Sequence, residues 1–328
     1  MTARTAFLTG ATGFIGGRLA QELAARGTHL RCLVRSRSDT ADLERLGAEL
    51  VPGEVTDEAA LARGLDGADV AFHLAAIYDL GVVDAAALER VNVGGTRAFL
   101  AAAERARARL VYVSTTAALG PTPAGGAGDE SSEFGARPYP STYHRTKAEA
   151  HRLAREAQRR GLPLVIVCPA VVYGPGDRGP NGRFLRDLIA GRIPGLLVPS
   201  GWFSYVHVDD VADGLILAVE RGRTGEVYVL SGEERAFNDF AAEVARLAGR
   251  RAPRLRFPAP LALATGAVLD LIGRLTGRRM PLSREGVAVA AGRWLHSHDK
   301  ATRELGWNPR PLRAGLPETV AWLLETRD

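Results

Sequence analysis

Two side chains in the segment YPSTYHRTKAEAHRLA, residues 139–154, have types and a spacing that suit acid–base chemistry. Tyr143 and Lys147 are four residues apart, so on a helix both project from one face. An ammonium beside a phenol favours the phenolate and lowers the pKa of the tyrosine. A tyrosine tuned in this way can transfer a proton near neutral pH. We therefore expect Tyr143 to be the acid–base group and Lys147 to assist it.

The rarity of lysine in this chain makes Lys147 more informative. Of 42 lysines and arginines only Lys147 and Lys300 are lysine, which leaves 40 arginines. Lysine is a compact donor, whereas arginine is a planar fork that stays protonated. A site built around one ammonium would resist replacement by arginine. A tyrosine and a lysine on an ordinary surface helix are the alternative interpretation, because the pair is common when taken alone.

A glycine-rich segment, FLTGATGFIGGRLA, lies between an apolar strand-like run and a helical pattern. Glycines there permit a tight turn and let backbone N–H groups approach a pyrophosphate at the helix N-terminus. The alternative is a plain strand–helix turn, but the context is the one that a dinucleotide-binding turn requires. The predicted cofactor-binding residues of this turn are Gly10, Thr12, Gly13, Phe14, Ile15 and Gly16.

The end of the second predicted strand, CLVRSRSD, bears on the choice of cofactor. NAD-selective sites carry an acidic residue about 20 residues after the glycines, where it bonds the ribose 2′-hydroxyl. Arg35 stands in that place, with Arg37 close by. An arginine can hold a 2′-phosphate through two hydrogen bonds. These residues predict a preference for NADP(H) over NAD(H).

The first half of the chain alternates short apolar runs with helical patterns, which predicts βαβ units and a parallel sheet. The apolar runs lack in–out alternation, as is typical of strands covered on both faces. We expect an α/β protein with a Rossmann-type doubly wound sheet. The predicted strands are residues 5–9, 28–34, 48–53, 69–75, 109–114 and 162–168.

The alternation stops after Cys168, which suggests a second, smaller lobe. We expect residues 1–168 to form the NADP-binding domain, together with return segments at about 203–230. Residues 169–202 and 231–328 are then the mostly helical substrate-binding lobe.

Composition excludes several kinds of function. The net charge is +5, but the arginines are scattered among acidic residues and no basic run is interleaved with aromatics, so we expect no nucleic-acid partner. Cys32 and Cys168 lie in apolar runs and predict buried free thiols, and we expect no metal site.

Nothing in the sequence predicts secretion or a membrane span. A strand-like run begins at Thr5, so we expect no signal peptide. The apolar stretch FPAPLALATGAVLDLIGRL, residues 257–275, is interrupted at Asp270, which leaves it short of a span of roughly 20 residues. It predicts a helix that caps an apolar pocket, and contact of this stretch with a membrane surface is the alternative. We expect a cytoplasmic protein.

Further motifs occur in a recognisable order: TGATGFIG, FHLAA, YxxxK, VYGPG, VHVDDVA and a late LGW. With them the chain resembles the extended short-chain dehydrogenases/reductases, which include the NAD-dependent epimerase/dehydratase group. The resemblance covers nearly the whole length. Within the family the chain is most similar to dihydroflavonol-reductase-like enzymes and to bacterial members known as hopanoid-associated sugar epimerases.

The resemblance implies a third catalytic hydroxyl five residues before Gly120, which is Thr115 in VSTTAALG. It also implies that Asn92 braces the helix behind the active site. Glu54 stands where the family usually has Asp. Further cofactor contacts implied by the resemblance are Glu54 and Val55 at the adenine, Leu74, Ala75 and Ala76 at the pyrophosphate and ribose, and Pro169 and Val172 near the nicotinamide.

The resemblance leaves three functions to compare: a carbonyl reductase, a nucleotide-sugar epimerase or dehydratase, and a non-catalytic nucleotide-binding regulator. Sugar-nucleotide enzymes place an arginine and an asparagine where this chain has Phe203 and Val171, and dehydratases place Asp-Glu where it has Thr116-Ala117. Arg183, Arg186 or Arg293 could reach a diphosphate by another route.

The intact Tyr143 and Lys147 argue against the regulator. We expect a reductase for an apolar ketone or aldehyde. The predicted substrate residues are Tyr78, Thr116, Val171 and Phe203. The family resemblance also implies a homodimer formed through the helices at about 84–107 and 143–160.

Overall fold

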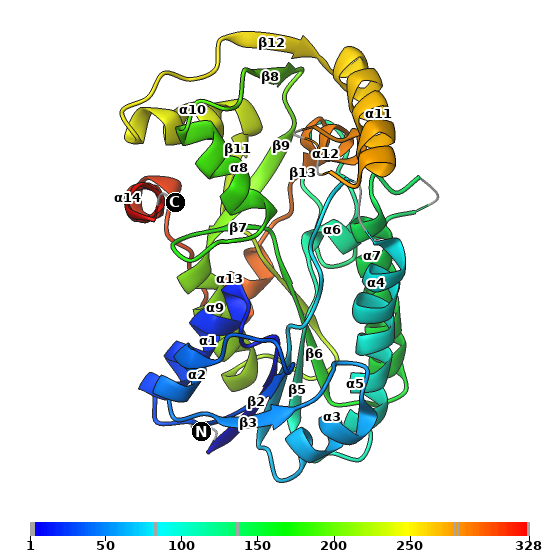
Figure 1. Ribbon diagram of the computed structural model, residues 1–328. Coiled ribbons are helices and arrows are strands. Elements are labelled where there is room, and N and C mark those ends of the chain that lie inside the picture. Colours follow the sequence, from blue (N-terminus) through cyan, green and yellow to red (C-terminus); the bar gives the residue numbers. More distant parts are fainter. Residues whose placement is uncertain (1–3, 82–83, 136–137, 279, 281, 327–328) are drawn as a thin grey trace.

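The computed structural model describes residues 4–81, 84–135, 138–278, 280 and 282–326 (Figure 1). In these residues seven parallel strands form one sheet in the order β10-β6-β5-β4-β1-β2-β3. The strand order reverses between β1 and β4, which opens a crevice at the carboxyl ends of these two strands. The strands are β1 (Thr5–Thr9), β2 (His29–Val34), β3 (Glu49–Pro52), β4 (Val70–His73), β5 (Arg109–Val113), β6 (Leu164–Pro169) and β10 (Val227–Leu230).

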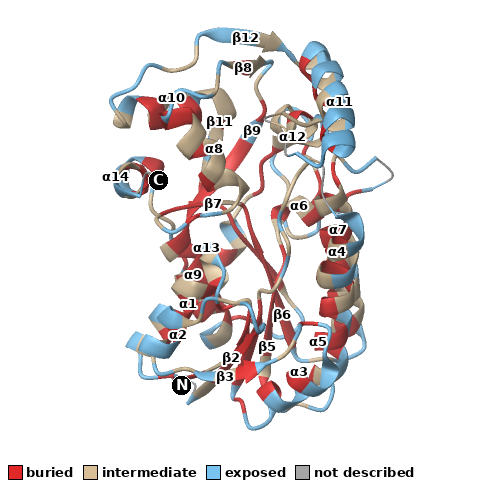
Figure 2. Ribbon diagram, in the orientation of Figure 1, coloured by how far each residue is buried: buried red, intermediate tan, exposed pale blue. Residues whose placement is uncertain are grey.

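Helices cover both faces of this sheet, so its strands are apolar on both sides (Figures 1 and 2). β6 is buried along its whole length, for example. One face is covered by α1 (Phe14–Ala25), α2 (Ala41–Arg45), α9 (Val208–Glu220) and α13 (Asp299–Leu305). The other is covered by α3 (Glu58–Leu65), α4 (Ala85–Leu88), a π-helical turn (Glu89–Gly94), α5 (Gly95–Ala103) and α7 (Thr142–Arg159). A short helix, α6 (Thr116–Leu119), follows β5.

A second, smaller lobe has its own sheet and its own aromatic core. Tyr205 and Phe240 stack at its centre with their ring centroids 4.0 Å apart. In its sheet β9 (Trp202–His207) pairs with β7 (Val171–Tyr173), β11 (Glu233–Ala236) and β13 (Arg293–Trp294), and elsewhere β8 (Gly195–Val198) pairs with β12 (Leu255–Pro258). Its helices are α8 (Pro180–Ile189), α10 (Phe237–Leu247), α11 (Ala259–Thr276), α12 (Arg284–Ala290) and α14 (Leu312–Glu325).

The predicted doubly wound parallel sheet is confirmed, and all six predicted strands belong to it with ends shifted by at most two residues. The structure differs from the expected division at two places. Residues 202–207 form β9 of the second sheet, because the edge beside β6 is taken by β10. The segment 299–307 returns to the large sheet, where Ala301, Leu305 and Trp307 join its core.

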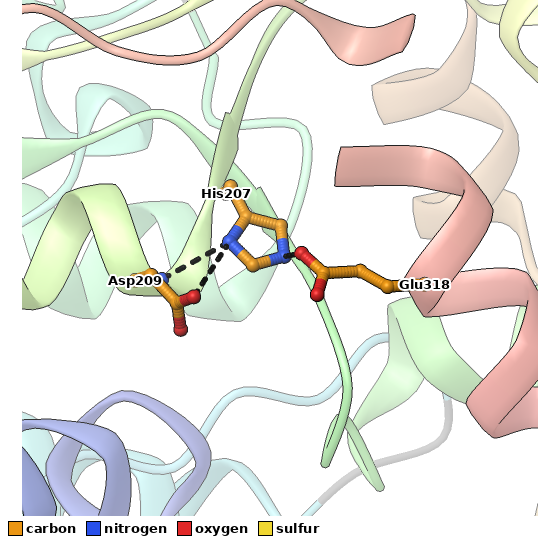
Figure 3. Close-up of side chains that lie close together, drawn as sticks. All are labelled: His207, Asp209 and Glu318. Carbon is orange, nitrogen blue, oxygen red and sulfur yellow. Dashed lines mark hydrogen bonds and ion pairs between the residues drawn. The ribbon is translucent and has the colours of Figure 1, made fainter. Parts of the chain in front are cut away.

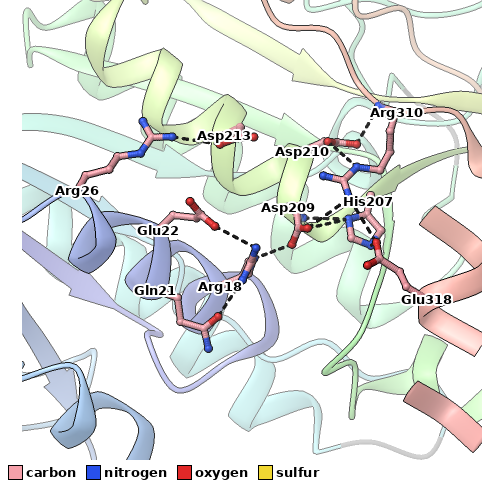
Figure 4. Close-up of polar contacts among 10 residues, drawn as sticks. All are labelled: Arg18, Gln21, Glu22, Arg26, His207, Asp209, Asp210, Asp213, Arg310 and Glu318. Atoms are coloured by element: carbon pink, nitrogen blue, oxygen red, sulfur yellow. Dashed lines mark hydrogen bonds and ion pairs between the residues drawn. The ribbon is translucent and has the colours of Figure 1, made fainter. Parts of the chain in front are cut away.

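A polar network around Arg310, which lies just after this returning segment, connects α9 of the large lobe with α14 of the smaller lobe (Figure 4). Arg310 pairs with Asp210 of α9 at 3.0 Å, with Asp209 at 3.3 Å and with Glu318 of α14 at 3.3 Å. Arg18 of α1 pairs with Asp209 at 2.6 Å. Asp210 is buried, so its carboxylate depends on these partners.

Replacing Arg310 tests how much the network contributes to stability. We expect Arg310→Met to lower the free energy of unfolding by about 2–4 kcal/mol, because it leaves a buried carboxylate without its cation. Chemical denaturation measures the change. Arg313→Met, at an exposed position three residues later, is the matched control and should stay within about 0.5 kcal/mol of the parent. Equal stability of the two variants would contradict a structural role for the network.

Candidate active site

A cavity of about 1890 Å³ lies at the carboxyl ends of the large sheet and extends into the smaller lobe. A crevice at this place is where open parallel sheets bind their ligands. Arg37 is exposed and is not among the residues that line the cavity. The predicted site residues that line it are Gly10, Thr12, Gly13, Phe14, Ile15, Gly16, Arg35, Glu54, Val55, Leu74, Ala75, Ala76, Tyr78, Thr115, Thr116, Tyr143, Lys147, Pro169, Val171, Val172 and Phe203.

The glycine turn between β1 and α1 has a geometry that only glycines fit. Gly10 has a φ of +77°, and a Cβ there would lie 2.7 Å from the backbone nitrogen of Ala75. A Cβ at Gly16 would lie 2.1 Å from the carbonyl oxygen of Gly10. Among the described residues no side chain caps α1, and its first turn carries no acid. Its free N–H groups and its dipole therefore suit the pyrophosphate of a dinucleotide.

Arg35 follows β2 and is exposed at the rim of the same end of the cavity. The sequence interpretation missed two acids nearby, since Asp39 and Asp42 also line the cavity. The oxygen Oδ1 of Asp39 accepts a hydrogen bond from the backbone nitrogen of Ala41 at 3.2 Å, which engages this carboxylate at the start of α2. Glu54 and Val55 follow β3 at the same edge of the sheet. This end of the cavity therefore contains both a cation and acids.

The three predicted catalytic residues meet beyond the end of β5. Tyr143 lies in the first turn of α7, and the side chain of Thr115 is near enough to its phenol to lower the pKa of that phenol. The Nζ atom of Lys147 donates to the carbonyl oxygen of Val113 at 3.2 Å. It also lies 5.2 Å from the ring centroid of Tyr112. The hydroxyl, the phenol and the ammonium thus belong to one constellation in the cavity wall.

Burial sets the protonation of this group. It raises the pKa of Tyr143 to about 12, although the hydrogen bond from Thr115 opposes the shift. It lowers the pKa of Lys147 to about 8. The expected lowering of the pKa of Tyr143 is therefore wrong in its net direction, because desolvation of the phenol is the largest effect on it. At neutral pH the phenol keeps its proton, and a group that must donate a proton needs this state.

Asn92, in the π-helical turn, connects the loop after β4 to helix α7. Its Oδ1 accepts from the backbone nitrogen of Ile77 at 2.8 Å, and its Nδ2 donates to the carbonyl oxygen of Ile77 at 3.0 Å. Its Nδ2 also lies 3.0 Å from the hydroxyl of Thr146 on α7. The predicted bracing role of Asn92 is confirmed.

The substrate side of the cavity is mainly apolar. Phe203 is buried and packs beside Tyr205 and Phe237. The ring of Tyr78 lies 4.7 Å from that of Tyr143. Other apolar residues that line this part are Phe184, Leu185, Ile193, Leu196, Phe240, Phe257, Leu261, Val287, Val289, Trp294 and Trp322.

Tyr78 and Arg183, both named from the sequence, have polar partners that sequence reasoning missed, Asn181 and Asp79. The hydroxyl of Tyr78 donates to Oδ1 of Asn181 at 3.3 Å. Arg183, on the same helix as Asn181, pairs with Asp79 at 3.5 Å. No local sequence pattern predicts these two contacts, because the loop after β4 and helix α8 meet only in the folded chain.

One group of side chains in the described residues has the arrangement of metal ligands: His207, Asp209 and Glu318 (Figure 3). Nε2 of His207 lies 3.0 Å from Glu318, and Nδ1 lies 3.6 Å from Asp209. Both carboxylates already pair with Arg310, and Asp209 pairs with Arg18 as well (Figure 4). Guanidinium groups thus neutralise the carboxylates that a metal ion would need as ligands. We therefore assign His207, Asp209 and Glu318 a structural role.

Comparison with known proteins identifies the family. Residues 6–231 match the model of the NAD dependent epimerase/dehydratase family. The chain belongs to this family. Members use a nicotinamide cofactor, and the chain is an NAD(P)-dependent oxidoreductase of the extended short-chain dehydrogenase/reductase type.

Relatives with different activities are similar over nearly the whole chain. Sterol demethylase protein B of Methylococcus capsulatus is 34% identical, with 98% of each chain covered. A 4-hydroxy-2-methyl-3-oxo-4-farnesyl-3,4-dihydroquinoline-1-oxide ketoreductase of Stigmatella aurantiaca is 35% identical over 93% of this chain and 92% of its own. The crystal structure of a nucleoside-diphosphate-sugar epimerase from Pseudomonas aeruginosa has a TM-score of 0.79 and 29% identity, with 98% of this chain and 97% of that chain covered.

The two lysines of this epimerase/dehydratase-family protein allow a matched test of the buried ammonium. The depressed pKa of Lys147 means that its charge opposes folding below about pH 8, and this penalty fades as the pH rises towards the ordinary value of 10.5. We expect Lys147→Met to raise the free energy of unfolding at pH 7 by about 1–3 kcal/mol while it removes activity.

Lys300→Met is the control for that experiment. Lys300 is paired with Glu226 at 2.7 Å and donates to the carbonyl oxygen of Val227 at 2.8 Å, so this variant should lose stability. Chemical denaturation at pH 7 measures both. A loss of stability in Lys147→Met as large as that in Lys300→Met would contradict the desolvation penalty.

Proposed function

We propose that the protein is an NADP(H)-dependent reductase that converts an apolar ketone or aldehyde into an alcohol. The observation that carries this proposal is the protonated, half-buried phenol of Tyr143 beside Thr115 and Lys147, in the same cavity as the glycine turn. When bound, the reduced nicotinamide supplies the hydride to the carbonyl carbon and is itself oxidised.

The residues of this chain do the rest of the reaction. Thr115 donates a hydrogen bond to the carbonyl oxygen of the substrate and so orients it. Tyr143 gives that oxygen its proton, which completes the hydroxyl group of the alcohol. Lys147 holds the ribose hydroxyls and keeps a positive charge close to the phenol while it loses its proton. The glycine turn and Pro169 and Val172, which line the cavity, fix the position of the dinucleotide.

The lining of the smaller lobe supports an apolar substrate rather than a sugar diphosphate. Phe203 and Val171 line the cavity at the two positions where sugar-nucleotide enzymes place polar residues. Of the three arginines that could replace these contacts, Arg183 lines the cavity and is paired with Asp79, while Arg186 and Arg293 are not lining residues. The names of two relatives, a sterol-modifying protein and a ketoreductase of a farnesylated compound, agree with this choice.

Two other functions can be distinguished from a reductase by experiment. A nucleotide-sugar epimerase or dehydratase is the alternative enzyme, and the family model and the epimerase structure favour it. A non-catalytic regulator that binds NADP(H) ranks last, because Thr115, Tyr143 and Lys147 are all present in the cavity wall. The homodimer and the cytoplasmic location stay predictions.

The first experiment follows NADPH oxidation with a panel of bulky apolar ketones and aldehydes. We expect Tyr143→Phe to lower kcat by about 10²–10⁴-fold, because it removes the proton donor, while NADPH binding is kept. Tyr139→Phe, which changes an exposed tyrosine four residues earlier, is the control and should keep its activity. Undiminished turnover in Tyr143→Phe would rule out its role as general acid. A thermal shift with nucleotide-diphosphate sugars, without reduction of any carbonyl compound, would favour the epimerase.

The choice of cofactor depends on Arg35. We expect Arg35→Ala to weaken NADPH binding by about 10–100-fold and NADH binding much less, because a charge-assisted hydrogen bond to the 2′-phosphate is lost. Fluorescence titration with both nucleotides measures the ratio, and Arg37→Ala shows whether the second arginine contributes. Tighter binding of NADH than NADPH by the parent protein would overturn the NADP(H) preference and assign a ribose contact to Asp39 or Asp42.

A further inference from the structure

The 18-residue helix α11 turns its large apolar side chains towards solvent. Leu261 and Val268 are each 59% exposed, Leu271 is 58% exposed and Leu275 is 78% exposed, and Ile272 is 41% exposed. On a helix these five positions fall on one face. Figure 2 shows α11 at the outer edge of the smaller lobe, with most of its surface in the exposed colour.

The opposite face of α11 packs closely against the start of α12, so the apolar face cannot turn inward. Ala262, Gly266 and Gly273 are the buried residues of the helix. A Cβ at Gly266 would lie 2.7 Å from the backbone nitrogen of Arg284, at the start of α12. Oδ2 of Asp270 accepts a hydrogen bond from the same nitrogen at 3.0 Å. The helix is thus an integral part of the lobe and presents a fixed apolar surface.

Exposed arginines precede and follow α11 in the chain, and its last turn carries one more. Among the described residues from 250 to 278 the only acid is Asp270, which is bonded to α12. Every arginine in this range is exposed: Arg250, Arg251, Arg254, Arg256, Arg274 and Arg278. An apolar face flanked by arginines complements a membrane surface, where acyl chains lie below anionic headgroups.

The same helix forms a wall of the active-site cavity. Leu261, Ala262 and Thr265 of α11 line the cavity, as does Phe257 just before the helix. A molecule or surface that contacts the outer face of α11 therefore lies next to the apolar end of the cavity.

We propose that α11 lies in the surface of an anionic lipid membrane, with Leu261, Val268, Leu271, Ile272 and Leu275 in the acyl boundary and the arginines against the headgroups. The protein is then peripheral. By length and composition α11 could cross a membrane, and it is the one such helix in the described residues. A span, however, would break its packing on α12 and carry Asp270 into the bilayer core.

A second copy of the chain is a poorer occupant of this face. A two-fold interface places the same patch on both subunits, so it would add the exposed arginines next to α11 in one copy to those in the other. Repulsion between like charges opposes such a contact, whereas anionic lipid is attracted.

If the proposed reduction of an apolar carbonyl compound is correct, contact of α11 with the membrane lets the substrate pass from the bilayer to the cavity. That last step rests on the proposed function, and the membrane contact does not.

Vesicle flotation tests the contact with the full-length protein. We expect the parent to float with phosphatidylglycerol/phosphatidylcholine vesicles, to float less as salt is added, and to float poorly with phosphatidylcholine alone. Leu271→Glu/Leu275→Glu should lower the partition coefficient by at least about tenfold. Arg274→Glu/Arg278→Glu, at exposed positions in the last turn of α11 and just after it, should weaken the preference for anionic vesicles. Arg105→Glu/Arg107→Glu, at exposed positions of the large lobe, should bind like the parent.

Three results would overturn the proposal. They are the absence of flotation by the parent with anionic vesicles, undiminished flotation of Leu271→Glu/Leu275→Glu, and a dimer in analytical ultracentrifugation that this variant dissociates without any vesicle binding. Thermal melts and NADPH titration of each variant show that the fold and the nucleotide site are intact. Because flotation needs no turnover, a failure of the reductase assay and a failure of the membrane contact are distinguishable.

Discussion

The proposed chemistry of this protein depends on the desolvation of two ionisable side chains, Tyr143 and Lys147, beyond the carboxyl end of β5. Removing Tyr143 and Lys147 from water makes the charged form of each less stable, so the phenol holds its proton and the ammonium holds its proton less tightly. The cost of burying Lys147 is partly offset by its bond to the carbonyl oxygen of Val113. The parallel sheet and its large apolar core supply the stability that this arrangement needs.

The sequence could predict what depends on local spacing. The glycines of the turn, the four-residue interval from Tyr143 to Lys147 and the apolar runs of the six strands are all fixed within short segments, and the structure has them as expected. Predictions that depend on distant partners succeeded less often. The pattern of β9 is that of a strand, but nothing in it says that β7, β11 and β13 are its neighbours. The pKa of Tyr143 was predicted in the wrong direction because its burial is made by several segments at once.

The cavity and the surface of the smaller lobe have the same chemical character. Phe203 and the aromatic residues around it give the inner wall its apolar lining, and α11 carries apolar side chains on both sides of that wall. A water-soluble sugar nucleotide would gain little from either surface. Under the proposed function, a substrate that partitions into lipid would be stabilised by the cavity and would reach it from the membrane that α11 contacts.

Titration of Lys147 by NMR tests the central claim most directly. Because the chain has only two lysines, protein grown with ¹³Cε-labelled lysine gives two signals, and Lys147→Met assigns them. If burial sets the protonation of the catalytic pair, the Lys147 signal titrates with a pKa of about 8. A pKa of Lys147 at or above its ordinary value of 10.5 would contradict the account, because the ammonium would then be stabilised by a charge or by solvent rather than desolvated.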